Sequence, residues 1–334
     1  MTSIIFVIIG LSLLILVHEW GHFLAARFFN LLVEEFGIGF PPRLLKKKIG
    51  ETVFTLNAIP LGGFVKIYGE NADMGEEVRY PQRSFVHQDA WKRATIIVAG
   101  VLMNFIFGWL VISAIFFVGS PSIILIETVT EDSPAYAAGI QSGDRVLNHD
   151  TIDSLIGFID SNKGSLITLD IKRGSEELQI SAVPRINSPV GEGSLGIAIR
   201  EGGVPKHGLF TSIGKGFITS VTLVGAIFVG FYQVIFMPEY ILGPVGIFDM
   251  AVNTGQLGLI YLFKFIALIS LNLVVLNILP IPALDGGRLL FIIVEKIRGK
   301  RFKHSTELRA NAIGFAFLIA LVFLITIKDV VGLF

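Results

Sequence analysis

Cysteine is absent from this chain of 334 residues, and histidine occurs at only 6 positions. Without cysteine there can be no disulfide and no thiolate ligand, so a bound metal would need histidine, aspartate, glutamate or backbone oxygen. An excess of charge of one sign is also lacking, because 27 basic residues balance 27 acidic ones. No long basic tract is present, which argues against a nucleic-acid partner. Charged residues make up 16% of the chain and hydrophobic residues 52%, a composition typical of membrane proteins.

Long apolar runs account for much of this hydrophobicity, and the mean hydropathy is +0.71. A spanning helix needs about 20 mostly apolar residues. The candidates are residues 4–26, 94–118, 262–284 and, in a shorter run, 312–327. The first candidate lacks a basic leading region and a small-residue cleavage site, so we expect a retained helix rather than a signal peptide.

Residues 217–236 are apolar enough to form a further span, but the charge pattern argues against one. Basic residues are concentrated in 27–93 and 288–309, whereas acidic residues outnumber basic ones in 127–201. The positive-inside tendency places the two basic segments in the cytoplasm and the acidic segment outside. A span at 217–236 would move 288–309 outside, so we expect an interfacial or re-entrant element there. With four spans, both termini lie outside.

The predicted fold class is a polytopic α-helical membrane protein with about four transmembrane helices and two polar insertions. Residues 52–68 alternate apolar and polar residues around Gly62-Gly63, which predicts a membrane-associated β-hairpin or sheet. Residues 119–202 are polar and rich in short β-type runs, which predicts one inserted extracytoplasmic α+β domain. The remaining segments are two halves of a membrane core, 1–118 and 262–334, and a linker, 203–261.

The first span contains His18-Glu19-Trp20-Gly21-His22. Residues four apart share a helix face, so His18 and His22 can bind one Zn²⁺, and Glu19 beside them can take a proton from water. An ionisable residue at the centre of a span costs about 2.5–3.5 kcal/mol on insertion scales, and such residues usually mark function. We therefore expect this cluster to be catalytic rather than structural.

A catalytic zinc site needs a third protein ligand, and Asp285 is the best candidate. The histidines outside the first span lie in polar loops or in the outer segment: His87, His149, His207 and His304. Asp285 is expected at the inner end of the third span, at a depth similar to that of the histidine pair. Its position before Gly286-Gly287 also suits an ordinary turn, which is the alternative interpretation.

Asn272 and Asn277 lie upstream of Pro280 and Pro282 in the third span. The two prolines should break the helix and free backbone groups near the metal. Asn277 could then hold a substrate backbone in extended form or orient the carbonyl under attack. Asn272 is as well explained by an amide contact between helices.

Five motifs make the chain resemble the bacterial site-2 proteases of the RseP type, which are zinc enzymes that cut substrates inside the membrane. The motifs are HEWGHFLAAR, FGIGFPPRL, NAIPLGGFVKIYGE, GPVGI and LNILPIPALDGGRLLF, and the resemblance covers nearly the whole length. It implies that His18, His22 and Asp285 are zinc ligands and that Glu19 is the general base. Asn277 and Asn272 fall where the family has substrate-contacting asparagines.

The resemblance also implies how substrate is held. Residues 52–68, with Gly62 and Gly63, look like the family's membrane re-entrant β-structure, which pairs with the substrate by strand addition. A helical substrate hides its amides, so an exposed strand edge that receives an unwound segment is physically sensible.

The segment EDSPAYAAGIQSGDRVLNHD, residues 131–150, resembles the core of a bacterial PDZ domain. Many RseP relatives carry two such domains in tandem, whereas this chain has room for one. The PDZ domain would exclude untrimmed proteins or present trimmed tails, and a plain spacer is the alternative.

The function implied is intramembrane zinc proteolysis in a bacterial inner membrane, with the active site toward the cytoplasm and the PDZ domain outside. Expected substrates are single-span membrane proteins already trimmed outside, such as anti-sigma factors, or remnant signal peptides. One rival is a non-proteolytic zinc-binding PDZ scaffold, which would not need Glu19. Another is a zinc transporter, which would need a polar path across the whole bilayer.

Overall fold

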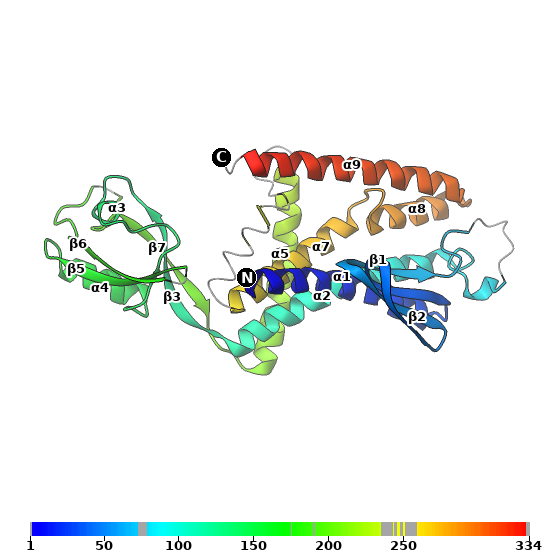
Figure 1. Ribbon diagram of the computed structural model, residues 1–334, viewed down its shortest axis with the longest axis horizontal. Helices are drawn as coiled ribbons and strands as arrows, with labels where there is room; N and C mark the ends of the chain where they lie inside the picture. Colours follow the sequence, from blue (N-terminus) through cyan, green and yellow to red (C-terminus); the bar gives the residue numbers. More distant parts are fainter. Residues whose placement is uncertain are drawn as a thin grey trace. The chain divides into compact units, whose positions relative to one another are not determined.

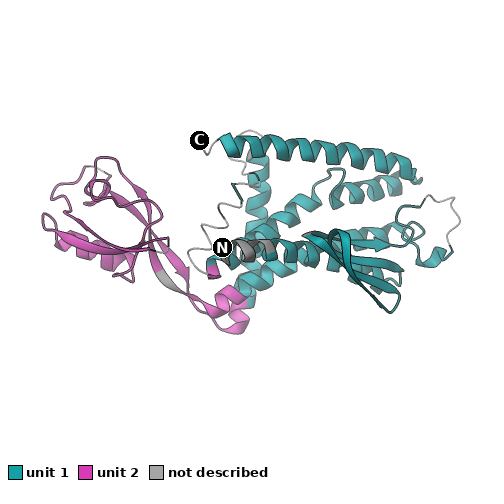
Figure 2. Ribbon diagram, viewed as in Figure 1, with its two compact units in different colours: residues 1–113, 213–255, 261–334 teal, residues 114–212, 256–260 magenta. Residues whose placement is uncertain are grey.

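The computed structural model describes residues 2–72, 79–174, 176–189, 191–234, 243, 246–247, 250 and 259–331. The chain forms two compact units (Figure 2). Unit 1 comprises residues 1–113, 213–255 and 261–334, and unit 2 comprises residues 114–212 and 256–260. The candidate site residues expected from the sequence all lie in unit 1. Of the GPVGI motif, residues 243, 246 and 247 are described, and the other two lie outside the described residues.

Each of the four expected spans corresponds to a long helix (Figure 1). These helices are α1 (Thr2–Phe28), α2 (Ala90–Val118), α7 (Leu259–Ile278) and α9 (His304–Val331). Helix α5 (Leu209–Val234) is a fifth, so the described residues hold 5 helices long and apolar enough to cross a membrane rather than four. Residues 217–234 form part of one continuous helix, which differs from the re-entrant alternative.

The helices near the candidate site cross closely because glycines face their neighbours. A Cβ atom at Gly21 of α1 would collide with the carbonyl oxygen of Ala99 in α2. A Cβ at Gly108 of α2 would lie 2.8 Å from Leu271 of α7, and one at Gly10 would lie 2.7 Å from Ile266 of α7. Small residues let helix backbones approach in this way in membrane proteins. Helices α1, α2 and α7 therefore form one packed group.

The third span ends earlier than expected. Helix α7 stops at Ile278, since Pro280 and Pro282 cannot donate helical hydrogen bonds. A short turn follows, and Asp285 begins a separate helix, α8 (Asp285–Arg298), rather than ending the span. The turn is held by a hydrogen bond of 3.0 Å from the backbone N–H of Ala283 to Oδ1 of Asn311 in α9.

A small sheet forms from β1 (Val33–Ile49) and β2 (Thr52–Ile67), joined to the helix α2 by a segment that includes η1 (Pro81–Arg83). Residues 35–38 pair with 53–56 and also with 63–66, while residues 43–49 pair with 52–57. The two halves of β2 are thus separated by part of β1, so of the hairpin or sheet expected at residues 52–68 the structure forms a sheet. Phe23 of α1 packs against this sheet, with ring centroids 5.6 Å from Phe36 and 5.8 Å from Phe54.

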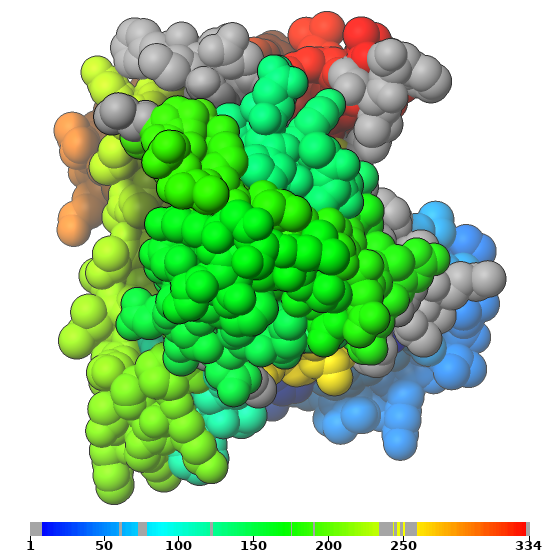
Figure 3. Space-filling model, turned by 90° about the vertical axis from the view of Figure 1, so that its left-hand side faces the viewer, coloured from blue at the N-terminus to red at the C-terminus, as the bar shows by residue number. Residues whose placement is uncertain are grey.

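Unit 2 is an α+β domain, whose atoms form one continuous body (green, Figure 3). Its five-stranded sheet has the order β6-β5-β4-β3-β7, with each neighbouring pair antiparallel. The strands are β3 (Ser120–Val129), β4 (Arg145–Val146), β5 (Ile167–Arg173), β6 (Glu176–Ala182) and β7 (Ile197–Val204). Helices α3 (Pro134–Ala137) and α4 (Ile152–Ser161) complete it, each capped by a hydroxyl, from Ser133 and Thr151. The buried core includes Ile124, Leu155 and Leu169.

Candidate metal centre

The structure brings together three ligand atoms from opposite ends of the chain. Nε2 of His18 lies 3.0 Å from Oδ2 of Asp285, and Nε2 of His22 lies 3.3 Å from the same oxygen. The two Nε2 atoms are 3.2 Å apart. The side chains are largely buried, with 12% of each histidine and 13% of Asp285 exposed. Among the described residues this is the one group of three side chains that could hold a metal ion.

Two nitrogens and one carboxylate oxygen are a ligand set that zinc prefers. Tetrahedral zinc with bonds of about 2.0–2.1 Å has neighbouring ligand atoms about 3.3 Å apart. The three distances between the ligand atoms, 3.0, 3.2 and 3.3 Å, are close to this spacing. Oδ2 of Asp285 is also buried and accepts no hydrogen bond from the described residues. The residues present therefore fit a zinc ion and leave a fourth position for water or substrate.

Helix α2 supports both histidines along one of its faces. The Nδ1 atom of His22 lies 2.8 Å from the carbonyl oxygen of Ile96, and Nδ1 of His18 lies 3.3 Å from Nδ2 of Asn104. Gly100 lies between Ile96 and Asn104 in the sequence of α2. A Cβ at Gly100 would collide with the His22 ring and lie 2.9 Å from Cε1 of His18. These positions are four residues apart, so they share a helix face. The backbone of α2 thus closes one side of the site.

The two glycines after Asp285 let the first turn of α8 lie against the turn that ends α7. A Cβ at Gly286 would collide with the carbonyl oxygens of Ile278 and Leu279, and one at Gly287 would collide with that of Ile281. The Asp-Gly-Gly sequence is therefore needed for packing as well as for turn formation. This close contact fixes where the Asp285 carboxylate points.

The sheet reaches the site through Gly63. A Cβ at Gly63 would lie 3.4 Å from Leu16 and 3.5 Å from Cγ of Glu19. Among the described residues, 63–67 pair with β1 alone, so this segment is an edge of the sheet. Gly62, with a φ of +108°, adopts a backbone conformation that suits glycine. The edge strand and Glu19 are consequently neighbours.

The two asparagines of the third span lie at different places. Asn277 is partly buried in the last turn of α7, next to the Ile278 carbonyl that faces Gly286. Asn272 is partly buried more than one turn earlier, and its Oδ1 atom is buried without a hydrogen-bond partner among the described residues. The structure gives neither side chain a contact with the three ligand atoms.

The support from α2 was missed by sequence reasoning. Asn104 is fully buried, at 0% exposure, in the second span. An amide side chain among the mostly apolar residues of a span is a signal for function, and it could have pointed to Asn104. Ile96 acts only through its backbone, and no residue-type pattern could have identified it.

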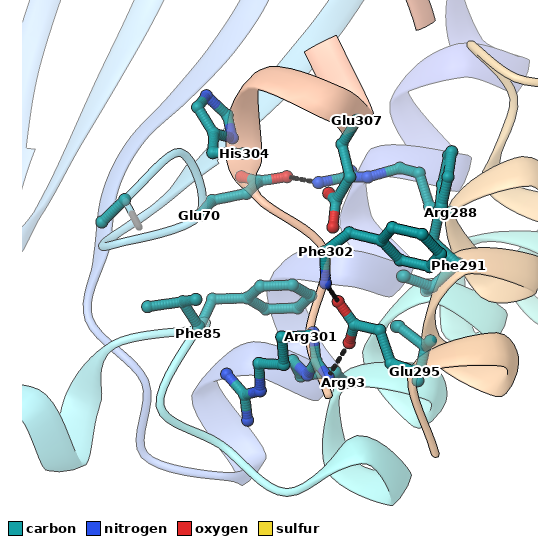
Figure 4. Close-up of a pocket in the computed structure, with 14 residues that line it drawn as sticks. Glu70, Phe85, Arg93, Arg288, Phe291, Glu295, Arg301, Phe302, His304 and Glu307 are labelled. Carbon is teal, nitrogen blue, oxygen red and sulfur yellow. Dashed lines mark hydrogen bonds and ion pairs between the residues drawn. The ribbon is translucent and has the colours of Figure 1, made fainter. Parts of the chain in front are cut away.

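A second polar cluster lies in a separate pocket (Figure 4). Nη2 of Arg93 in α2 lies 2.6 Å from Oε2 of Glu295 in α8, and both side chains are buried. The other oxygen of Glu295 accepts a hydrogen bond of 3.0 Å from the backbone N–H of Phe302. Arg288 forms an ion pair with Glu70 just beyond β2. This charged pocket joins α2, α8 and the start of α9.

Two histidines on one helix, a converging aspartate and an intervening glutamate, set among membrane-length helices, define a membrane metallopeptidase. The chain belongs to peptidase family M50, the site-2 protease family, whose sequence model matches residues 6–321. It is 31% identical to zinc metalloprotease RasP of Shouchella clausii over 414 residues, covering 97% of each chain. It is 28% identical to the regulator of sigma-W protease RasP of Bacillus subtilis, covering 100% of this chain and 99% of that protein.

These comparisons support the catalytic class and the metal. The chain is a zinc metalloprotease and a multi-pass membrane protein. Both alignments are longer than this chain, over 414 and 421 residues against 334, so these relatives have segments without a counterpart here.

Proposed function

We propose that the protein cleaves peptide bonds in the transmembrane segments of single-span membrane proteins. His18, His22 and Asp285 would hold the zinc ion, and Glu19 would be the general base. The observation that carries this proposal is the convergence of the three ligand atoms, 3.0–3.3 Å apart, beside Glu19 and among membrane-length helices. A scaffold that only binds metal needs no carboxylate at that place.

Bound zinc supplies the Lewis acidity that activates water and polarises the substrate carbonyl. Glu19 takes a proton from the attacking water and returns it to the leaving amine. The Ile96 carbonyl accepts a hydrogen bond from Nδ1–H of His22 and so keeps the Nε2 lone pair directed at the metal position. The packed backbones of α1 and α2 hold these groups at fixed distances, which reduces the cost of orienting them for reaction.

The substrate would bind as an added strand at the free edge 63–67. A transmembrane helix must unwind before hydrolysis, because its amides are hydrogen-bonded internally. An edge strand offers unpaired backbone groups to an extended segment. Gly63 lies close to Glu19, so a segment paired with this edge would cross the metal position. Asn277 and Asn272 would hold the substrate backbone from α7.

The substrate class is an anti-sigma factor already trimmed outside the membrane, or a remnant signal peptide. One relative is named for the regulation of sigma-W, which supports the first of these. We place the protein in a bacterial inner membrane, with the metal centre toward the cytoplasm. The charge bias of the loops supports this orientation.

Helix α5 would then lie along the membrane interface rather than cross the bilayer. It runs across α2 and α9 rather than alongside them (Figure 1). Its first half is held to α2 by Trp109, whose Nε1–H donates a hydrogen bond of 3.0 Å to the carbonyl oxygen of Ile213. An interfacial α5 keeps both basic segments on one side of the membrane.

Unit 2 would be a single extracytoplasmic PDZ domain. Residues 131–150 supply the capped helix α3 and the turn into β4, which are the features of the PDZ-like motif. Such a domain would exclude untrimmed proteins or present the tails of trimmed ones.

The proposal is tested with Glu19→Gln and His22→Phe beside the wild type, purified in detergent. Zinc content and cleavage of a generic single-span substrate are followed together. We expect one zinc per chain in wild type and Glu19→Gln, cleavage by the wild type alone, and loss of both in His22→Phe. Cleavage by Glu19→Gln would overturn the role of Glu19. Zinc without cleavage, tested over several trimmed substrates, would favour a scaffold.

A further inference from the structure

The two histidines present their Nδ1 atoms to different partners on α2. Nδ1 of His22 lies 2.8 Å from the Ile96 carbonyl oxygen. A carbonyl oxygen can only accept a hydrogen bond, so Nδ1 of His22 carries the proton and Nε2 carries the lone pair. The protonation pattern that a metal ligand needs is therefore set by the backbone for His22.

His18 has a side chain in the corresponding place. Its Nδ1 atom lies 3.3 Å from Nδ2 of Asn104, two turns along α2 from Ile96. Asn104 is fully buried, and its Oδ1 atom is without a hydrogen-bond partner among the described residues. A buried amide oxygen without a partner costs about 1–3 kcal/mol. The Asn104 amide thus lowers the stability of the fold, and it points at the His18 ring of the candidate metal centre.

We propose that Asn104 is a positioning residue for His18, holding its ring and accepting a hydrogen bond from its Nδ1–H whenever Nε2 binds zinc. This inference rests on the proposed function. The amide nitrogen can donate to an unprotonated Nδ1, as the recorded arrangement allows. A half-turn of the amide exchanges Oδ1 and Nδ2 within the same volume, and Oδ1 then accepts a hydrogen bond from protonated Nδ1.

An amide suits this place because it is neutral and can both donate and accept. A carboxylate could accept, but its charge would be costly among apolar helices. A leucine has nearly the same shape and can do neither. The backbone at this position is fixed from the other side, since Oγ of Ser270 in α7 donates a hydrogen bond of 2.8 Å to the Asn104 carbonyl. Ring support and backbone anchoring can therefore be separated by mutation.

The test measures zinc affinity of the purified full chain by competition with a chelator. The variants are Asn104→Leu, which removes the hydrogen bond, and Asn104→Asp, which keeps an acceptor for Nδ1. The matched control is Ser270→Ala, which removes a buried hydrogen bond at the same helix contact without touching His18. The midpoint of thermal unfolding is recorded for all four proteins in the metal-free form.

Removal of an outer partner of a histidine ligand typically weakens metal affinity about 10–100-fold. We expect a loss of that size in Asn104→Leu and affinity near that of wild type in Asn104→Asp and Ser270→Ala. Unaltered affinity in Asn104→Leu would overturn the proposal. An equal loss of zinc affinity in Asn104→Leu and Asn104→Asp would also overturn it, because it would indicate a packing role for Asn104. The comparison of zinc affinity between these two variants remains decisive even if one of them is less stable.

Cleavage by the same proteins separates this inference from the proposed function. At limiting zinc, cleavage by Asn104→Leu should fall, and added zinc should restore much of it. If the wild type itself bound no zinc, the proposed function would fail. If the wild type bound zinc and Asn104→Leu bound it equally well, only the role of Asn104 would fail.

Discussion

The metal centre and the charged pocket both place carboxylates inside unit 1, but the charges of these carboxylates are balanced differently. In the pocket, Glu295 faces Arg93 at 2.6 Å and Glu70 faces Arg288. In the metal centre, the Asp285 carboxylate lies against two imidazoles, and among the described residues no arginine or lysine forms an ion pair with it. The chain neutralises its own charge in the pocket. At the metal centre, a bound cation would neutralise the Asp285 carboxylate.

This difference separates a structural polar cluster from a functional one. A buried ion pair that is complete within the chain contributes to a defined fold, although its net stabilisation is small. Burying a converging set of lone pairs without a partner lowers the free energy of unfolding, and the arrangement is useful only when a metal ion binds to it. Substitutions in the two clusters should therefore have opposite effects on stability and on chemistry.

The largest expected effect is that of Asp285→Ala. Loss of a ligand should weaken zinc affinity by more than the roughly 10–100-fold typical of an outer partner, and cleavage should be lost. The metal-free protein should be as stable as the wild type or more stable, because a buried carboxylate has been removed. Zinc competition, cleavage and thermal unfolding in detergent measure the three quantities. A clear fall in metal-free stability would show that Asp285 is structural.

Arg93→Met should show the reverse pattern. It leaves Glu295 buried, at 4% exposure, without its cation, which should destabilise the protein by about 3–5 kcal/mol. Zinc affinity of the folded protein should be unchanged, since no ligand contacts Arg93. Unfolding of the purified protein and zinc competition are the measurements.

The double variant Arg93→Met, Glu295→Leu sharpens this prediction. Replacing both partners by apolar residues removes the unpaired charge, so most of the lost stability should return. If the double variant were less stable than Arg93→Met alone, Glu295 would stabilise the fold even without its partner, and removal of the unpaired charge would not restore stability. That result would remove the distinction drawn between the two clusters.

Sequence patterns predicted those parts of the structure that depend on local signals. Hydropathy located the four expected spans, and the spacing of His18 and His22 placed both on one helix face. Asp285 was found from its motif and topology, although it begins α8 instead of ending α7. Pro280 and Pro282 were expected to break the helix, and α7 does end before them, but the apolar run did not show that a new helix begins at Asp285.

The parts that were missed depend on contacts between distant segments. Strand β1 was not expected, because Gly39, Pro41 and Pro42 interrupt its pattern, yet residues on both sides of them pair with β2. The pairing of Arg93 with Glu295 joins α2 to α8 and has no local signal. The contribution of the Ile96 carbonyl depends on where α2 packs, and any residue type would supply it.

The comparison between clusters also predicts that a polar group with little burial should have the smallest effect, and His149 in unit 2 is such a group. It is partly buried, with its ring 4.9 Å from that of Phe158 and its Nδ1 atom 3.1 Å from Oγ of Ser154. Burial lowers the pKa of His149 below its ordinary value of 6.5, against the opposing effect of Asp150. The folded domain therefore holds this proton less tightly than the unfolded chain does.

A lowered pKa means that the contribution of His149 to stability is fully present above pH 6.5 and is lost as the pH falls below it. We expect unit 2 to open slightly more often at pH 5.5 than at pH 7.5, and His149→Gln to remove that part of the difference. Because the chain has no cysteine, Ala135→Cys in the domain core can report opening through its rate of thiol labelling. The comparison is made between His149 and His149→Gln at each pH, so that the ionisation of the thiol cancels. An identical pH dependence in both proteins would mean that even partial burial of this ring costs its charged form nothing.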